Sequence, residues 1–115
     1  MAARLRQARE HWGLSQREVG VRMGLDKDTA SARISRYESG SMSISLESLF
    51  ELANALEVPP AFLLADRPSM ANAIMALSAE STTDQDRMAE LLLALTRLPP
   101  EQREEIIRRA LPSDR

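Results

Sequence analysis

Apolar residues recur every three or four positions along much of the chain, which is the spacing of one face of an α-helix. Leu5 and Ala8 predict a first helix over residues 2–11, and Trp12 is expected to close the core behind it. A second apolar stripe, over residues 45–58, consists of Leu46, Leu49, Phe50, Ala53 and Leu56. No run alternates apolar and polar residues in the manner of a half-buried strand. The pattern therefore predicts an all-α fold.

Capping signals between these segments predict two short helices joined by a turn. Ser15 is a good N-cap, and Glu18 stands at the reciprocal position of a capping box. Gly24 can adopt the left-handed conformation that ends a helix, and Asp26 or Asp28 can cap the next one. The second helix carries a small, polar and basic outer face. This combination is typical of a helix-turn-helix that lies in a DNA groove.

Two prolines separate the second apolar stripe from a further short helix. Pro59 and Pro60 end the preceding helix, and Pro60 suits the first turn of a fifth helix that reaches Leu64. A chain of 115 residues with 43% hydrophobic content can bury one modest core. We therefore expect one five-helix domain over residues 1–66 and a helical extension over residues 67–115.

The formal net charge of −2 and the pI near 5.4 disfavour nucleic acid as a partner, but the distribution of charge favours it. Residues 1–36 contain eight basic and four acidic side chains, whereas residues 37–66 contain five acidic and no basic ones. Positive charge is thus concentrated on the segment that contains the helix-turn-helix. We expect double-stranded DNA as the partner.

The composition disfavours several other functional classes. The absence of cysteine removes disulfides, thiolate chemistry and cysteine-bound zinc, and it fits a reducing compartment. No apolar run approaches the roughly 20 residues of a membrane span, and the N-terminus has no signal-peptide core. His11 is the only histidine, and the glycines form no phosphate-binding loop. We expect a soluble, cytoplasmic protein that is not an enzyme and binds no metal or cofactor.

Four stretches of sequence occur in the order, and at nearly the spacing, of a known family. They are GLSQREVG before the turn, ISRYESG at the end of the following helix, ISLESLFELANALEV, and PPAFLLAD. Residues 4–66 therefore resemble the lambda-repressor and Cro-like domain, also called the Xre-type helix-turn-helix. The resemblance implies a five-helix fold whose third helix enters the major groove. It also implies that Gln16 anchors the DNA backbone and that Glu38 is buried and paired with Arg6 or Arg9.

One departure from the family lies between the turn and the third helix. Family members have fewer residues there, whereas eight residues separate Leu25 from Ile34 in this chain. We interpret the difference as one extra helical turn, which lengthens the third helix. Counted at about 100° per residue, Ala30, Tyr37 and Glu38 then share the inner face with Ile34.

The outward residues of this helix carry groups that can read DNA. Arg33 or Arg36 can hold a guanine with two hydrogen bonds, and Thr29 or Ala32 can contact a thymine methyl group. When this chain is aligned with the family at Ile34, the resemblance implies base contacts at Ser31, Ala32 and Arg36. The loop that follows has no basic residue, so its phosphate contacts would depend on hydroxyls and amides. The predicted DNA-binding residues are Gln16, Arg17, Lys27, Thr29, Ser31, Ala32, Arg33, Ser35, Arg36 and Ser41.

The tail beyond residue 66 predicts three more helices with extensive apolar faces. Thr83 or Asp84 can cap the second of them. Pairs at i,i+4 spacing support the third: Glu104 with Arg108, and Glu105 with Arg109. We expect these faces to pair two chains into a homodimer, which suits two-fold symmetric operators. The predicted dimerisation residues are Met70, Ile74, Leu77, Met88, Leu91, Leu92, Leu95, Ile106 and Ile107.

Two functions of different classes fit this sequence. The first is a dimeric, sequence-specific DNA-binding transcriptional regulator, most simply a repressor that occupies a palindromic operator. The second is an antitoxin or adaptor whose C-terminal helices bind a protein partner, with DNA binding secondary. The basic, hydroxyl-rich third helix favours the first, and the acidic total leaves room for the second.

Overall fold

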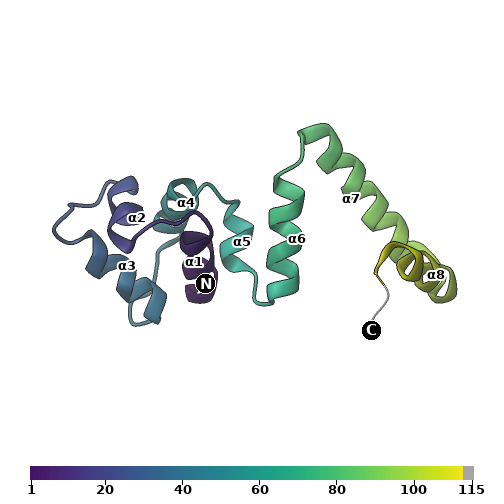
Figure 1. Cartoon of the computed structure of the whole chain (residues 1–115), viewed down its shortest axis with the longest axis horizontal. Coiled ribbons are helices and arrows are strands. Elements are labelled where there is room, and N and C mark those ends of the chain that lie inside the picture. The colour runs from purple at the N-terminus through teal and green to yellow at the C-terminus, as the bar shows by residue number, and fades with distance from the viewer. Residues whose placement is uncertain (113–115) are drawn as a thin grey trace. The chain divides into compact units, whose positions relative to one another are not determined.

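The computed structural model describes residues 1–112, and every regular element within that range is an α-helix (Figure 1). The all-α prediction is therefore confirmed. The helices are α1 (Ala2–His11), α2 (Gln16–Arg22), α3 (Ala30–Ser39), α4 (Leu46–Ala55), α5 (Pro60–Leu64), α6 (Pro68–Ser78), α7 (Thr82–Arg97) and α8 (Pro100–Ala110). They form two compact units, a first unit over Met1–Ala79 and a second unit that begins at Glu80. Across the described residues, no helix combines the length and apolar character of a membrane span.

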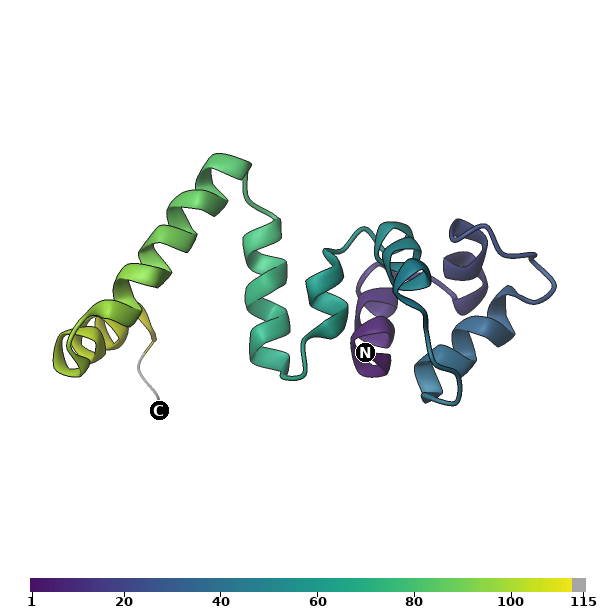
Figure 2. The same ribbon diagram turned by 180° about the vertical axis from the view of Figure 1, so that it is seen from behind.

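The core of the first unit is made by buried side chains from each of its first five helices. Leu5, Val19, Ile34, Leu52 and Phe62 are at most 1% exposed. α1 packs against both α3 and α5, while α2 packs against α3 and α4 (Figure 2). The short α5 is thereby held in the centre, and it presents its other side to α6.

The expectation that Trp12 closes this core is wrong. Its side chain is 45% exposed and packs edge-on against His11, with ring centroids 4.9 Å apart. α1 ends at His11, and Gly13 then turns the chain at φ 66°. Leu14, two residues after Trp12, is the side chain that enters the core.

The predicted stripe on α4 is also partly wrong, because Leu46 and Phe50 are 68% and 54% exposed. The buried side of the segment consists of Leu49, Leu52, Ala53 and Leu56. Both sets have helical spacing, so periodicity alone did not distinguish them. Packing against α5 and α2 decides which of the two faces inward.

The prediction of a lengthened third helix is wrong as well. α3 begins at Ala30, so the additional residues lie in the connection between α2 and α3. The Asp26 carboxylate accepts a hydrogen bond from the Asp28 N–H at 2.9 Å, and the Asp26 carbonyl accepts from Thr29 and Ala30 at 3.0 and 2.8 Å. A side chain that bonds to its own local backbone, as Asp26 does with the Asp28 N–H, competes with helix formation. Neither aspartate caps α3; its N-cap is Thr29, whose hydroxyl donates to the Asp26 carbonyl at 3.3 Å and makes no capping bond to the helix.

α6 belongs to the first unit, although the sequence suggested a boundary after residue 66. It packs on α5, and Ala71 is completely buried there. A hydrogen bond of 3.4 Å from Gln7 to Asn72 links it to α1. One side of the apolar helix is thus covered within the unit, while Met70 remains 57% exposed.

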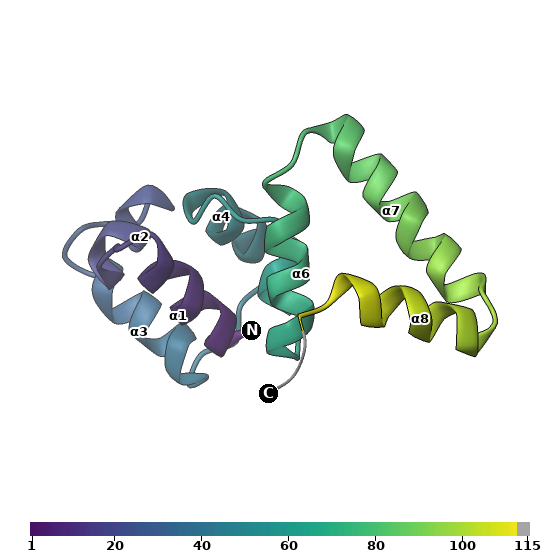
Figure 3. The same ribbon diagram turned by 45° about the vertical axis from the view of Figure 1, so that its right-hand side comes forward.

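The second unit contains no buried side chain in either of its helices, α7 and α8, which follow one another through a short proline turn (Figure 3). The N-cap of α7 is Ser81, whose hydroxyl accepts from the Asp84 N–H at 3.2 Å, rather than Thr83 or Asp84. On α8, Glu105 pairs with Arg109 at 2.9 Å as predicted. Arg108 pairs with the same carboxylate at 2.7 Å instead of with Glu104.

Gly20 marks the closest approach of α2 to α3, and it provides a test of this packing. A Cβ at Gly20 would lie 2.5 Å from the Ala30 Cβ and 2.9 Å from its Cα. Alanine normally stabilises a helix relative to glycine. Here we expect Gly20→Ala to lower the free energy of unfolding by about 1–3 kcal/mol through overpacking, measured by thermal unfolding. Adding Ala30→Gly should restore part of the loss, and a melting temperature that does not fall would contradict this packing.

Candidate nucleic-acid interface

α3 presents one side to the core and the other to solvent. Ala30, Ile34 and Tyr37 are at most 3% exposed and fix the rotation of the helix against α1 and α2. The inner face predicted from the 100° count is therefore confirmed. The exposed side carries Ser31, Ala32, Arg33, Ser35 and Arg36, which are all of the predicted DNA contacts on this helix.

The two arginines on this exposed side are free to bind an external anion. Among residues 1–112, no ion pair or side-chain hydrogen bond involves the guanidinium of Arg33 or Arg36. Arg22 on α2 differs, because it donates to the Ala55 carbonyl at 3.4 Å and lies 3.9 Å from Glu57. The outer side of α3 thus carries two positive charges without an ion pair among the described residues.

Beneath this surface, the side chain of Glu38 is 5% exposed and joins the first three helices. Arg9 donates to both of its carboxylate oxygens, at 3.1 and 2.9 Å, and also donates to the Leu14 carbonyl at 3.0 Å. The predicted burial and pairing with Arg9 are therefore confirmed, and Arg6 lies at 3.6 Å. The bond to Glu38 raises the pKa of Arg9 above its ordinary value, so this guanidinium stays charged.

Gln16 links this buried carboxylate to the exposed side of α3. Its Nε2 donates to Glu38 at 3.1 Å, and its Oε1 is 3.5 Å from the Ser31 hydroxyl, which can donate to it. The sequence alone did not predict the Gln16–Glu38 bond. A signal was present, since a carboxylate on the inner face of a helix needs more than one donor. The bond fixes the side chain of Gln16 at the start of α2.

A capping box fixes the backbone at the same point, as predicted. The Ser15 hydroxyl accepts from the Glu18 N–H at 3.0 Å, and the Glu18 carboxylate accepts from the Ser15 N–H at 3.2 Å. The bond from the Ser15 backbone lowers the pKa of Glu18. α2 ends at Arg22, and Gly24 follows at φ 89°, so the predicted end of this helix is also confirmed.

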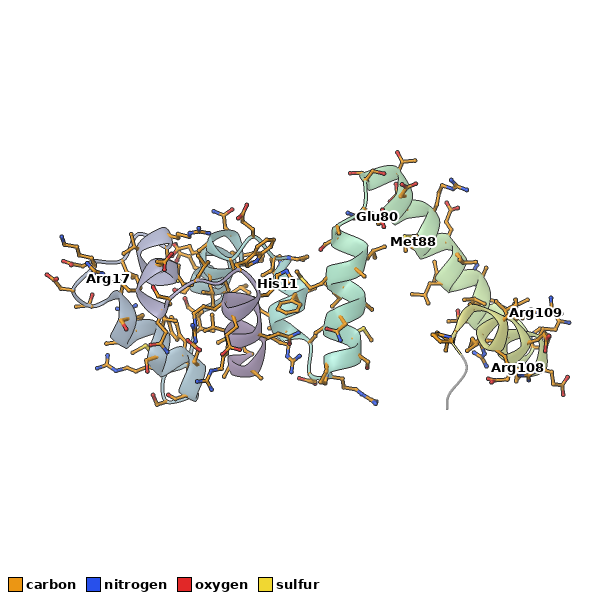
Figure 4. The ribbon with its side chains drawn as sticks, in the orientation of Figure 1. His11, Arg17, Glu80, Met88, Arg108 and Arg109 are labelled. Atoms are coloured by element: carbon orange, nitrogen blue, oxygen red, sulfur yellow. The ribbon has the colours of Figure 1, made fainter. Side chains whose placement is uncertain are left out.

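The remaining predicted contacts surround the two ends of α3. Lys27 and Thr29 lie exposed in the connection that precedes it, and Arg17 is exposed on α2 (Figure 4). At the other end, the Ser41 hydroxyl is 3.4 Å from the Arg36 carbonyl and can donate to it. These residues extend the surface of α3 along both directions of the helix axis.

Comparison with known proteins agrees with this geometry. A family model described as helix-turn-helix matches residues 5–63, which is more than half of the chain. Among solved structures, one similar to this chain is the crystal structure of the transcriptional regulator BswR, with a TM-score of 0.76 and 29% sequence identity. That likeness covers 82% of this chain and 93% of the other. No curated protein matches the sequence.

Glu38→Gln tests the connection between the three helices. The substitution keeps the size of the side chain but removes the charge that Arg9 faces, so the free energy of unfolding should fall by about 1.5–3 kcal/mol in urea at pH 7. Glu10→Gln is the matched control, since this exposed carboxylate lies 3.5 Å from Arg6. We expect the control to change stability by less than about 0.5 kcal/mol. Equal losses in the two variants would mean that Glu38 has no special structural role.

Proposed function

Because the chain belongs to the helix-turn-helix family, it is a DNA-binding regulator, and we propose that it acts in the cytoplasm as a dimeric repressor of a palindromic operator. The observation that carries the proposal is the outer side of α3, where Arg33 and Arg36 are exposed without an ion pair among residues 1–112. A rigid helix with forked donors on its outer side suits the major groove of DNA.

We assign direct base contacts to this outer side of α3. Arg36 and Arg33 hold guanine O6 and N7 with two hydrogen bonds each, because the guanidinium matches that pair of acceptors. Ala32 and Thr29 contact thymine methyl groups. Ser31 and Ser35 bond to a base edge or a phosphate.

Contacts to the phosphates come from the residues around α3. Gln16 is held by Glu38 through one N–H and keeps its second for a phosphate oxygen. Arg17 and Lys27 add positive charge on the α2 side, and Ser41 adds a hydroxyl at the far end. Phosphate contacts supply most non-specific affinity, and few of these groups are charged. Recognition therefore depends strongly on the base contacts.

The second unit supports association of two chains. Met88, Leu91 and Leu92 on α7 are 46%, 60% and 63% exposed, and Ile106 on α8 is 43% exposed. A pair of helices with no buried side chain gains little stability by itself. We propose that a second copy of the chain covers these residues, together with Met70, Ile74 and Leu77 of α6, Leu95 of α7 and Ile107 of α8. A two-fold dimer then matches a two-fold operator.

Repression is the simplest regulatory effect of a dimer that binds DNA through α3. A dimer bound across its operator blocks polymerase without any contact to it. The same exposed faces support a second function, that of an antitoxin or adaptor in which a different protein covers α7 and α8. The experiments below separate the two, because only the first requires a DNA consensus and self-association.

Selection of bound sequences from random duplex DNA tests the base contacts. We expect a two-fold symmetric consensus, and we expect Arg36→Ala to lose the preference at one position of each half-site. The loss of a two-bond contact to guanine costs about 1–3 kcal/mol per site. Arg67→Ala is the control, since Arg67 is also exposed but precedes α6. Failure of the native chain to enrich any sequence would eliminate the proposed function.

Sedimentation of the full chain tests the association. We expect a dimer that Leu91→Glu converts to a monomer, because the substitution puts a charge where the second copy packs. Leu64→Glu is a closely matched control, since Leu64 is 59% and Leu91 60% exposed. The control should remain dimeric. A native chain that sediments as a monomer at all concentrations would rule out the dimer.

A further inference from the structure

Four of the apolar residues in and directly after α7 lie on a single line along the helix. Met88, Leu91 and Leu95 of α7, and Leu98 at the C-cap directly after its last residue, are spaced by three, four and three positions. This is the a and d spacing of a helix that packs along one seam against another helix. Leu92 widens the seam on one side.

Within the second unit, α8 leaves much of this seam uncovered. Met88 and Leu91 are 46% and 60% exposed, whereas Leu95 and Leu98 are intermediate in exposure. A shallow hollow runs along the first half of α7, lined by Glu80, Asp84, Arg87, Met88 and Leu91. Figure 4 labels Glu80 and Met88 at this end of the helix. An apolar side chain from another chain can enter there.

We propose that two copies of α7 pack antiparallel along this seam, which deepens the dimer of the proposed function and rests on it. In this register Met88 lies opposite Leu98 of the partner subunit, and Leu91 lies opposite Leu95 of the partner subunit. All four apolar layers of the seam are then filled by apolar side chains. The hollow at Met88 receives the partner's Leu98.

The position of Asp84 selects the antiparallel orientation. It lies on the line of the seam, seven residues before Leu91. Parallel pairing in register would place the two Asp84 carboxylates opposite one another, and like charges there are unfavourable. In the antiparallel register Asp84 lies beyond the last apolar layer.

The charges at the two ends of α7 and the helix dipoles favour the same orientation. Asp84 and Asp86 lie near the N-terminus of α7, and Arg97 lies in its last turn. An antiparallel pair brings the acidic end of one helix towards the basic end of the other. It also places the positive end of each helix dipole beside the negative end of its neighbour.

The antiparallel pair sets the distance between the two points at which the chains enter it. With the two-fold axis near Leu93, the two Thr82 residues lie about 33 Å apart along the pair at 1.5 Å per residue. Half-sites one helical turn apart are separated by about 34 Å. The separation of the two Thr82 residues, where the chains enter the α7 pair, is thus similar to the distance between half-sites one helical turn apart.

Cysteine cross-linking tests the orientation, because the chain contains no cysteine of its own. Met88→Cys and Leu98→Cys are prepared in the full chain, checked for native helicity, and equilibrated in a glutathione redox buffer. Each variant alone should remain without a disulfide, since equivalent residues are about 15 Å apart in the antiparallel pair. The mixture of the two should form the mixed disulfide, identified by mass. Ala3→Cys, exposed on α1, is the control for chance collisions.

Three outcomes would overturn the proposal. A disulfide between two Met88→Cys chains would show a parallel pair. A dimer without the mixed disulfide would place the interface elsewhere, and a monomeric native chain would remove the pair altogether. Failure of the proposed function is distinguished by the selection on random DNA, because a consensus can be enriched whichever way α7 packs.

Discussion

The carboxylate of Glu38 is the group on which the DNA-binding unit depends. A charge this deeply buried costs several kcal/mol unless it is paired and hydrogen-bonded. Arg9 meets it with two donors and Gln16 with a third. Because these residues come from α1, α2 and α3, compensating the charge also sets the relative positions of the three helices. The exposed side of α3 is therefore presented at a fixed angle beside Gln16.

The two units are stabilised in different ways. The first unit has a buried core formed within one chain. Because Gly20 has no side chain, α2 and α3 can approach closely at Ala30. The second has no buried side chain of its own within residues 80–112. If a second copy of the chain buries the exposed apolar side chains of this unit, the stability of the unit depends on the concentration of the protein. Occupancy of a two-fold operator would then respond to that concentration more steeply than the binding of a monomer.

The extra residues before α3 affect the connection and not the recognition helix. Asp26 binds its own local backbone, so the chain turns once more before α3 begins at Ala30. The outward positions of α3 therefore keep their relation to Ile34. The added connection changes only what flanks the helix, namely Lys27 and Thr29.

The sequence by itself determined the features that depend on local interactions. The helical periods, the Ser15–Glu18 capping box, the end of α2 just before Gly24 and the inward side of α3 all follow from residues close in the chain. Tertiary structure decided the rest, because rotation and burial depend on partners distant in sequence. It selected Leu52 over Leu46 for the core of α4, left Trp12 exposed, and joined Gln16 to Glu38. It also joined α6 to the first unit, because Ala71 is buried where α6 packs on α5.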